Sequence, residues 1–249
     1  NAILVDGQDQ ASRKPGADGK LQRWFDSPAH GYVVGEVANP SVYGGLLKRW
    51  ERRALFLKPG LILIHDALQA TGDQARYDWL LHTVADPKTV ATGQSFTVQT
   101  EHAALQGKFL LPRDLDLKVT KGYPVEPVDR YSTRPVPPER YVWEWTVTAT
   151  PREQRGAEDF LTVLRVARGP AGAAPRCEAL TAQNAVGGRL ALPSETTVVL
   201  FRKPHSQGPL EGGGIKTDGE AAAVTVDSRR FVTRLCLLGG TFLRWEASR

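Results

Sequence analysis

Residues 48–70, KRWERRALFLKPGLILIHDALQA, read as two apolar strands joined by a turn at Pro59-Gly60. Proline pre-sets the φ angle needed at the second position of a type II turn, and glycine supplies the positive φ needed at the third. Both faces of the two strands are apolar near the turn, which is typical of a hairpin covered on two sides. We therefore expect this hairpin to lie at the centre of the fold.

A two-residue turn at Pro59-Gly60 places Arg53 directly opposite Asp66 in the ladder. Opposite charges at directly opposed positions attract each other, and a pair at the inner end of a covered hairpin is only partly exposed. We interpret Arg53 and Asp66 as a structural ion pair, with a catalytic role as the alternative.

Length and composition restrict the class of protein. The chain has 249 residues, 41% of them hydrophobic and 24% charged, which is enough for one large β domain or two smaller ones. No apolar run reaches membrane-spanning length, so we expect no membrane partner. The chain starts on a strand-like segment without an initiator methionine, which is typical of a fragment or a processed product.

The charge balance favours an anionic partner. The formal net charge is +5 and the isoelectric point is about 9.3. The basic residues are spread along the whole chain, and no nucleic-acid-binding signature occurs. An acidic polysaccharide therefore fits this composition better than a nucleic acid does.

Short apolar segments separated by glycine, proline and polar residues follow one another along the chain, with almost no amphipathic helix. This pattern predicts an all-β fold, an antiparallel β-sandwich of many short strands. A Gly/Ala/Pro-rich stretch at 168–176 marks the best internal boundary. We predict a main sandwich over residues 1–170, with residues 171–249 completing it or forming a smaller sheet.

Few residues carry an obvious chemical signature. The five histidines show no metal-ligand spacing, and Cys177 and Cys236 form neither a disulfide framework nor a metal cluster, although one disulfide bond is left open. His82 lies in the middle of a predicted strand, DWLLHTVAD. We interpret it as a hydrogen-bonded core imidazole, with catalysis or ligand contact as the alternative.

The best candidate for ligand contact is the long loop 122–140, GYPVEPVDRYSTRPVPPER, which contains five prolines. Arginine pairs bidentately with a carboxylate, and tyrosine stacks on or hydrogen-bonds to a pyranose ring. Arg130, Tyr131 and Arg134 are therefore our candidates for gripping a carboxylated sugar. The alternative is an ordinary solvated loop, or one that packs on a further domain.

Four blocks of sequence carry a resemblance to a known family: NAILVDGQDQ (1–10), YGGLLKRWERRALFLKPGLILIHDAL (43–68), DWLLHT (78–83) and EDFLTVLRV (158–166). In this order and spacing they resemble the C-terminal β-sheet region of heparinase II/III-like polysaccharide lyases, a group that includes oligoalginate lyases. The resemblance implies an N-terminal α/α toroid that packs on the β-sandwich, with the active site between them. It also implies β-elimination on a uronic-acid polymer, in which a base removes the C5 proton, a polar group neutralises the carboxylate and usually a tyrosine protonates the leaving oxygen.

The resemblance places the reactive groups outside this chain. In that family a histidine directly before the position of Asn1 binds a structural zinc ion, and the catalytic His, Asn and Tyr lie further upstream. We therefore expect no catalytic residue and no metal site in this chain. It would support the toroid and supply loops to the cleft, and the resemblance further implies a bacterial origin, a homodimer interface and a periplasmic or extracellular location.

Two other classes of function remain open from the residues. A non-catalytic carbohydrate-binding sandwich would carry an exposed aromatic platform. An assembly module would carry a large exposed apolar face that docks on another subunit.

Overall fold

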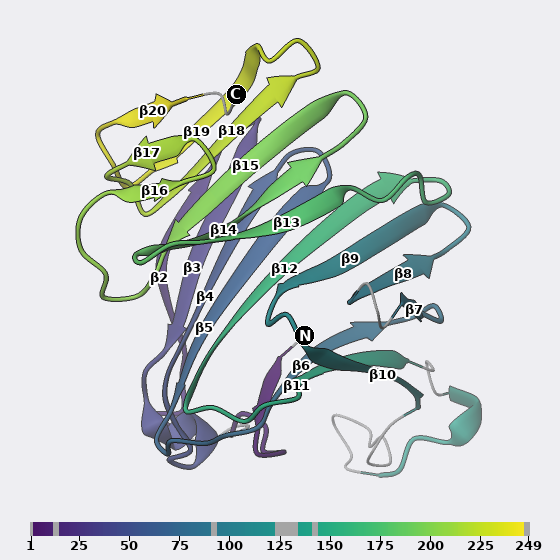
Figure 1. Cartoon of the computed structure of the whole chain (residues 1–249). Helices are drawn as coiled ribbons and strands as arrows, with labels where there is room; N and C mark the ends of the chain where they lie inside the picture. The colour runs from purple at the N-terminus through teal and green to yellow at the C-terminus, as the bar shows by residue number, and fades with distance from the viewer. Residues whose placement is uncertain (1, 12–14, 91–93, 123–133, 141–143, 247–249) are drawn as a thin grey trace.

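Antiparallel β-strands make up nearly all the regular structure of the protein (Figure 1). The computed structural model describes residues 2–11, 15–90, 94–122, 134–140 and 144–246. Within these ranges the helical elements are two short 3-10 turns, η1 (Pro40–Tyr43) and η3 (Pro138–Arg140), and no helix is long and apolar enough to cross a membrane. The predicted all-β, antiparallel fold is confirmed.

The strands form four sheets, of which the largest has eight strands in the order β2-β3-β4-β5-β12-β9-β8-β7. Its strands are β2 (Lys20–Asp26), β3 (His30–Val37), β4 (Leu47–Leu57), β5 (Leu61–Ala70), β12 (Ala157–Arg168), β9 (Ala103–Leu111), β8 (Ser95–Gln99) and β7 (Lys88–Val90). A four-stranded sheet contains β1 (Ile3–Val5), β6 (Tyr77–Thr83), β11 (Trp145–Pro151) and β10 (Leu115–Lys121).

The C-terminal strands form the two remaining sheets. The five-stranded sheet contains β13 (Arg176–Thr181), β14 (Ala185–Ala191), β15 (Glu195–Arg202), β18 (Ala221–Asp227) and β19 (Val232–Leu238). The three-stranded sheet contains β16 (Leu210–Gly212), β17 (Ile215–Thr217) and β20 (Leu243–Trp245). The proposed division into residues 1–170 and 171–249 stays a prediction.

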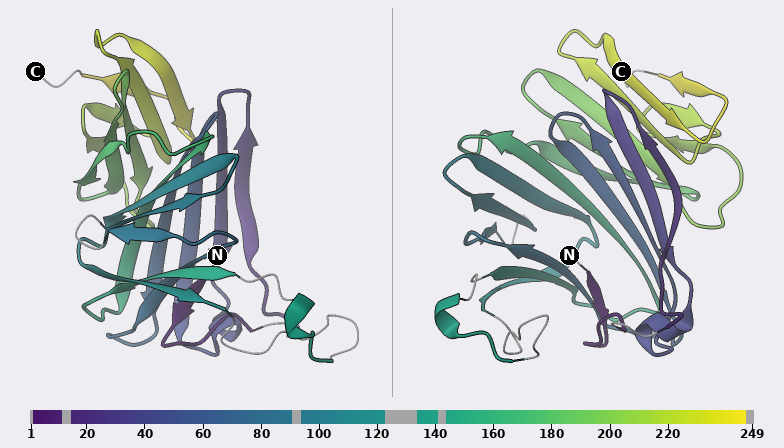
Figure 2. Two further views of the ribbon diagram at one scale, coloured as in Figure 1. Left: turned by 90° about the vertical axis from the view of Figure 1, so that its right-hand side faces the viewer. Right: turned by 180° about the vertical axis from the view of Figure 1, so that it is seen from behind.

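The four sheets stack in layers, with an apolar core between each neighbouring pair (Figure 2). Trp50 of β4 packs in the core toward the four-stranded sheet, whereas Leu55 packs in the core toward the five-stranded sheet. In β15, Val199 and Phe201 face the eight-stranded sheet, and Val198 and Leu200 face the three-stranded sheet. Strands buried on both faces are apolar at consecutive positions, because successive side chains point to opposite faces.

The central hairpin β4–β5 is covered on both sides, as the sequence indicated, but its predicted register is wrong by one residue. Leu57 pairs with Leu61, so the connection has three residues instead of two. Gly60 does not have the positive φ of a type II turn. It is needed because a Cβ atom there would lie 2.3 Å from the Val166 carbonyl oxygen of β12.

The shift in register changes which arginine lies opposite Asp66. Arg52, and not Arg53, lies opposite Asp66, and Arg53 lies opposite His65. Arg53 instead forms an ion pair with Glu51 on its own strand. The predicted Arg53–Asp66 pair is therefore wrong, because a one-residue slip moves every side chain of a strand to the other face.

The two cysteines lie at opposite edges of the five-stranded sheet. Cys177 is on β13 and Cys236 is on β19, and both thiols are free. Burial raises the pKa of each thiol to about 11. The disulfide bond left open by the sequence does not form, and both groups stay protonated at neutral pH.

Candidate functional site

A buried carboxylate on the central hairpin organises the face toward the four-stranded sheet. Asp66 is fully buried and accepts hydrogen bonds from Arg52 Nε at 2.5 Å and Arg52 Nη2 at 2.9 Å. Two indoles also donate to it, Trp50 Nε1 at 2.7 Å and Trp79 Nε1 at 3.3 Å. Both carboxylate oxygens therefore accept hydrogen bonds from side chains of two other strands, β4 and β6, which makes Asp66 a structural anchor rather than a reactive group.

The preceding residue of β5, His65, points to the other face of the sheet, into the core toward the five-stranded sheet. Its side chain is 1% exposed, and its Nε2 lies 2.8 Å from Asp159 Oδ1. The ring stacks on Phe201 with the ring centroids 5.9 Å apart. The Asp159 side chain is 37% exposed, so this contact connects a buried imidazole to a carboxylate that reaches solvent.

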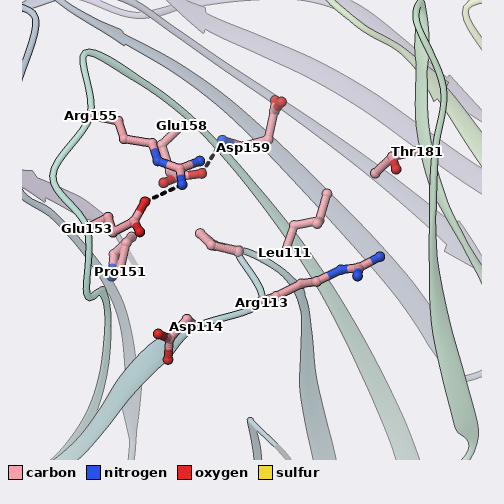
Figure 3. Close-up of a pocket in the computed structure, with 10 residues that line it drawn as sticks. Leu111, Arg113, Asp114, Pro151, Glu153, Arg155, Glu158, Asp159 and Thr181 are labelled. Carbon is pink, nitrogen blue, oxygen red and sulfur yellow. Dashed lines mark hydrogen bonds and ion pairs between the residues drawn. The ribbon is translucent and has the colours of Figure 1, made fainter.

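Asp159 lies in a cleft at the beginning of β12, which we call the β12 cleft (Figure 3). The cleft consists of two adjoining cavities of about 440 and 380 Å³ that share Arg155, Glu158 and Asp159. The first is further lined by Leu111, Pro112, Arg113, Asp114, Pro151, Glu153 and Thr181. The second is further lined by Arg49, Ala67, Leu68, Gln69, Ala157, Lys203, Pro204 and His205.

Positively and negatively charged side chains lie side by side in the β12 cleft. Figure 3 shows the Arg155 guanidinium beside Glu153, with which it forms an ion pair, and next to Glu158. Burial raises the pKa of Glu158, against a smaller opposing effect of the Asp159 backbone N–H and Arg155. In the other cavity, Lys203 Nζ donates to the Ala182 carbonyl oxygen at 2.8 Å.

Arg49 joins this second cavity to the polar groups of β3 and β4. Its Nε lies 2.9 Å from Glu36 Oε1, and it also contacts Glu51 and His205. Four basic side chains and four acidic ones line the two cavities, so the β12 cleft offers both cations and carboxyls to a polar ligand. Within it, Glu158 can keep a proton to a higher pH than a free glutamate.

Of the three residues that the sequence singled out for ligand contact, only Arg134 is described, and it does not line this cleft. Arg130 and Tyr131 lie outside the described residues. Arg134 is described and exposed, just before η3. Their role in binding stays a prediction.

His82 is not a core imidazole. Its side chain is 42% exposed, its Nδ1 lies 3.2 Å from Thr146 Oγ1 and it is 3.6 Å from Glu144. The strand that carries it has one face turned outward at this point, which the alternating pattern of β6 alone did not reveal.

Sequence reasoning missed the residues of the β12 cleft. The segment 151–157 is recognisable as a charged connection, but nothing in it marks Arg155, Glu158 and Asp159 as neighbours of His65. That contact spans 94 positions of the chain and exists only because β12 pairs with β5. The charged residues directly before the apolar strand were the available signal.

Among the side chains of the described ranges, no group of three or more His, Cys, Asp or Glu residues is placed to hold a metal ion. The expected zinc ligands upstream of Asn1 stay a prediction.

Comparison with solved structures defines the fold. The chain matches the heparan sulfate lyase HepC from Pedobacter heparinus with a TM-score of 0.59 and 12% identity over 83% of its own length. It matches the heparinase III BT4657 gene product with a TM-score of 0.61 and 13% identity over 82%. A further heparinase III crystal structure gives a TM-score of 0.59 with 12% identity over 82%.

These matches cover 31%, 30% and 29% of the three solved chains, respectively. The chain therefore has the fold of the C-terminal β region of heparinase III structures and spans about a third of their length, which confirms the resemblance seen in the sequence. No family model matches the sequence, and no curated protein sequence matches it.

Proposed function

We propose that this chain is the β-sandwich portion of a polysaccharide lyase that acts on uronic-acid-containing glycans by β-elimination. The observation that carries the proposal is the structural match over 82–83% of this chain to heparinase III and to the heparan sulfate lyase HepC. The net charge of +5 supports an acidic polymer as the partner.

In this proposal the chain supports a helical toroid and forms one wall of the substrate cleft. The base, the carboxylate-neutralising group and the tyrosine acid of β-elimination belong to the toroid, and so do the zinc ligands. The β12 cleft carries arginine and lysine side chains suited to sugar carboxylates, and Arg130, Tyr131 and Arg134 add further contacts from the long loop. A bacterial periplasmic or extracellular location and association into a homodimer belong to the same proposal.

Ultraviolet absorbance of unsaturated uronate tests the enzymatic part. We expect no product from alginate or heparan sulfate with this chain alone, and product with the chain joined to its upstream coding region. Product formation by the isolated chain would contradict the placement of the catalytic groups. An inactive longer protein, correctly folded and offered both glycans, would contradict the lyase assignment.

Substitution of loop residues in the longer protein tests the contacts. Arg134→Ala should raise the KM for the glycan roughly tenfold, the expected effect of losing one charge-assisted contact. The matched control is Arg229→Ala, an exposed arginine in the turn between β18 and β19. An equal effect of the two substitutions would remove Arg134 from the proposed contact set.

A second candidate function is a non-catalytic carbohydrate-binding sandwich. It is favoured by one observation: Trp24 on the edge strand β2 is 72% exposed. Calorimetric titration of the isolated chain with acidic and neutral oligosaccharides separates the two candidates. Tight glycan binding by the isolated chain, with no lyase activity in the longer protein, favours the binding module.

A further inference from the structure

Two basic side chains of the β12 cleft carry a charge that no carboxylate balances, and we call them the cleft cations. Arg113 lines the first cavity, and Lys203 lines the second. Figure 3 shows the Arg113 guanidinium pointing away from the carboxylates of Asp114 and Glu153. Lys203 Nζ donates to a neutral acceptor, the Ala182 carbonyl oxygen. In the part of the chain that the structure describes, neither cleft cation forms an ion pair.

The other two basic side chains of the β12 cleft are paired with carboxylates. Arg155 forms an ion pair with Glu153. The Arg49 side chain is 17% exposed and pairs with Glu36 and Glu51, neither of which lines the cleft. An arginine that is already paired attracts a further anion less strongly, because the charge of its partner opposes that anion. The cleft cations are therefore the groups best placed to bind an anionic ligand.

Asp159 is the carboxylate that the β12 cleft leaves available for a ligand, and it lines both cavities. Its Oδ1 lies 2.8 Å from Nε2 of the buried His65, which fixes its position and leaves Oδ2 for a further contact. Glu158 is the other carboxyl shared by the two cavities, and burial raises its pKa, which disfavours its charged form. Asp114 of the first cavity lies 3.4 Å from Arg152 Nε. The cleft therefore presents one available carboxylate and a cation in each cavity.

These charges match a ligand that has two anionic groups with hydroxyl groups between them. The two cavities, of about 440 and 380 Å³, each lie in the size range of ligand pockets. A carboxylate accepts hydrogen bonds from hydroxyl groups, and arginine and lysine form charge-assisted hydrogen bonds with carboxylates and sulfates. A glycan that is charged on only every second sugar would satisfy one cleft cation and leave the other beside a neutral ring.

We propose that the β12 cleft binds two consecutive sugars of an acidic glycan, one in each cavity, and that both sugars carry an anionic group. Arg113 pairs with the anionic group in the first cavity, Lys203 pairs with the one in the second, and Asp159 accepts hydrogen bonds from hydroxyl groups near the linkage. This inference rests on the proposed function for the choice of a glycan. It adds the charge pattern of that glycan, which is a polyuronate or a polymer sulfated on the sugar next to each uronate.

Substitutions that remove or keep charge test the two cleft cations separately. Arg113→Gln and Lys203→Gln each remove one cation, whereas Arg113→Lys and Lys203→Arg keep the charge. The matched controls are Arg229→Gln and Lys20→Gln, at exposed residues of the β18–β19 turn and of the edge strand β2 that do not line the cleft. Urea titration of every variant measures whether the fold is retained.

The measurement is calorimetric titration of the chain with four tetrasaccharides at low and high salt. Alginate has a carboxylate on every sugar, a glucuronate–N-acetylglucosamine fragment has one on every second sugar, a sulfated heparan sulfate fragment adds sulfate to the amino sugar, and cello-oligosaccharide is neutral. We expect alginate to bind roughly tenfold more tightly than the unsulfated fragment, the effect of one further charge-assisted contact. This preference should shrink at high salt, because solvent reaches both cleft cations.

Arg113→Gln and Lys203→Gln should each reduce the preference for alginate over the unsulfated fragment to about twofold or less, because one of the two anionic groups loses its partner. The charge-keeping variants and the two controls should retain the preference, and the affinity for cello-oligosaccharide should stay the same throughout. Binding of the sulfated fragment as tightly as alginate identifies sulfate as an equivalent partner of the cleft cations. Tight binding of alginate alone identifies a carboxylate on each sugar.

Equal binding of alginate and the unsulfated fragment by the unsubstituted chain overturns the inference, and so does absence of binding at millimolar tetrasaccharide. A loss of preference in Arg229→Gln or Lys20→Gln as large as in the cleft variants also overturns it. The lyase proposal has its own readout, because product formation by the longer protein can persist while the cleft substitutions have no effect.

Discussion

Asp66 and His65 are neighbours in the sequence but belong to two different environments. Asp66 points to the core under the four-stranded sheet, where four hydrogen bonds from Arg52, Trp50 and Trp79 reach its carboxylate. His65 points to the core under the five-stranded sheet, where Nε2 meets Asp159 and the buried Nδ1 has no hydrogen-bond partner among the described residues.

The difference shows that one face of β5 stabilises the fold, whereas the other face connects the core to the β12 cleft. A carboxylate with all its oxygens engaged costs a great deal to disturb and has no capacity left for a ligand. A ring with one unpaired nitrogen, joined to a partly exposed Asp159 in the β12 cleft, contributes less to stability and can respond to what enters the cleft. We therefore expect a substitution of Asp66 to lower the stability of the protein much more than a conservative substitution of His65 does.

The largest effect should come from Asp66→Ala. It leaves the Arg52 guanidinium and two indole N–H groups without their acceptor, so the free energy of unfolding should fall by about 3 kcal/mol, measured by urea titration. The control is Asp116→Ala, because Asp116 is 68% exposed in its pair with Arg152. We expect it to cost less than about 1 kcal/mol. Similar losses in the two variants would show that Asp66 is not an anchor.

Trp50→Phe should have the next largest effect. It removes the 2.7 Å hydrogen bond to Asp66 and leaves a smaller aromatic surface under Arg52, and should cost about 1–2 kcal/mol in the same titration. Trp79→Phe removes a longer hydrogen bond of 3.3 Å and should cost less. The reverse order would place the stronger contact of Asp66 on β6 instead of β4.

His65→Phe should change stability by less than about 1 kcal/mol. The new ring keeps the stacking on Phe201 and removes the unpaired Nδ1, which offsets the lost contact with Asp159. His65→Ala is the comparison, because it opens a cavity in the same core and should cost about 2–4 kcal/mol. A large loss in His65→Phe would make the imidazole an anchor like Asp66.

The smallest effect should be a pH dependence from Glu158. Burial raises its pKa above the ordinary value of 4.5, so between that value and the folded pKa the folded state binds more protons than the unfolded state. Stability contributed by this group is present at low pH and is lost as the pH rises through that window. The free energy of unfolding of the unsubstituted protein should therefore fall relative to Glu158→Gln on raising the pH from 4.5.

Urea titrations of both proteins at several pH values measure this difference. The control is Glu211→Gln, at a glutamate that is 66% exposed in its pair with Lys216, and its difference should stay nearly constant. A difference that grows in the opposite direction would mean that Arg155, and not burial, dominates the environment of Glu158.

Much of the fold was predictable because it depends on local pattern. Consecutive apolar residues in 54–57 and 61–64 indicate a strand pair buried on both faces, and the structure has such a pair, β4–β5, inside its largest sheet. The candidate site was much less predictable. Asp159 and Arg155 are ordinary charged residues in the sequence, and their contact with the face that carries His65 requires strands far apart in the chain to pair.

The sequence by itself determined an all-β chain, a doubly covered central hairpin and a positive net charge, because these follow from side-chain period and composition. Only the tertiary structure decided the register of that hairpin. Gly60 has no side chain because the Val166 carbonyl approaches it closely, and the sequence of the hairpin contains no trace of that neighbour. One residue of register then placed Arg52 beside Asp66 and turned His65 toward the cleft.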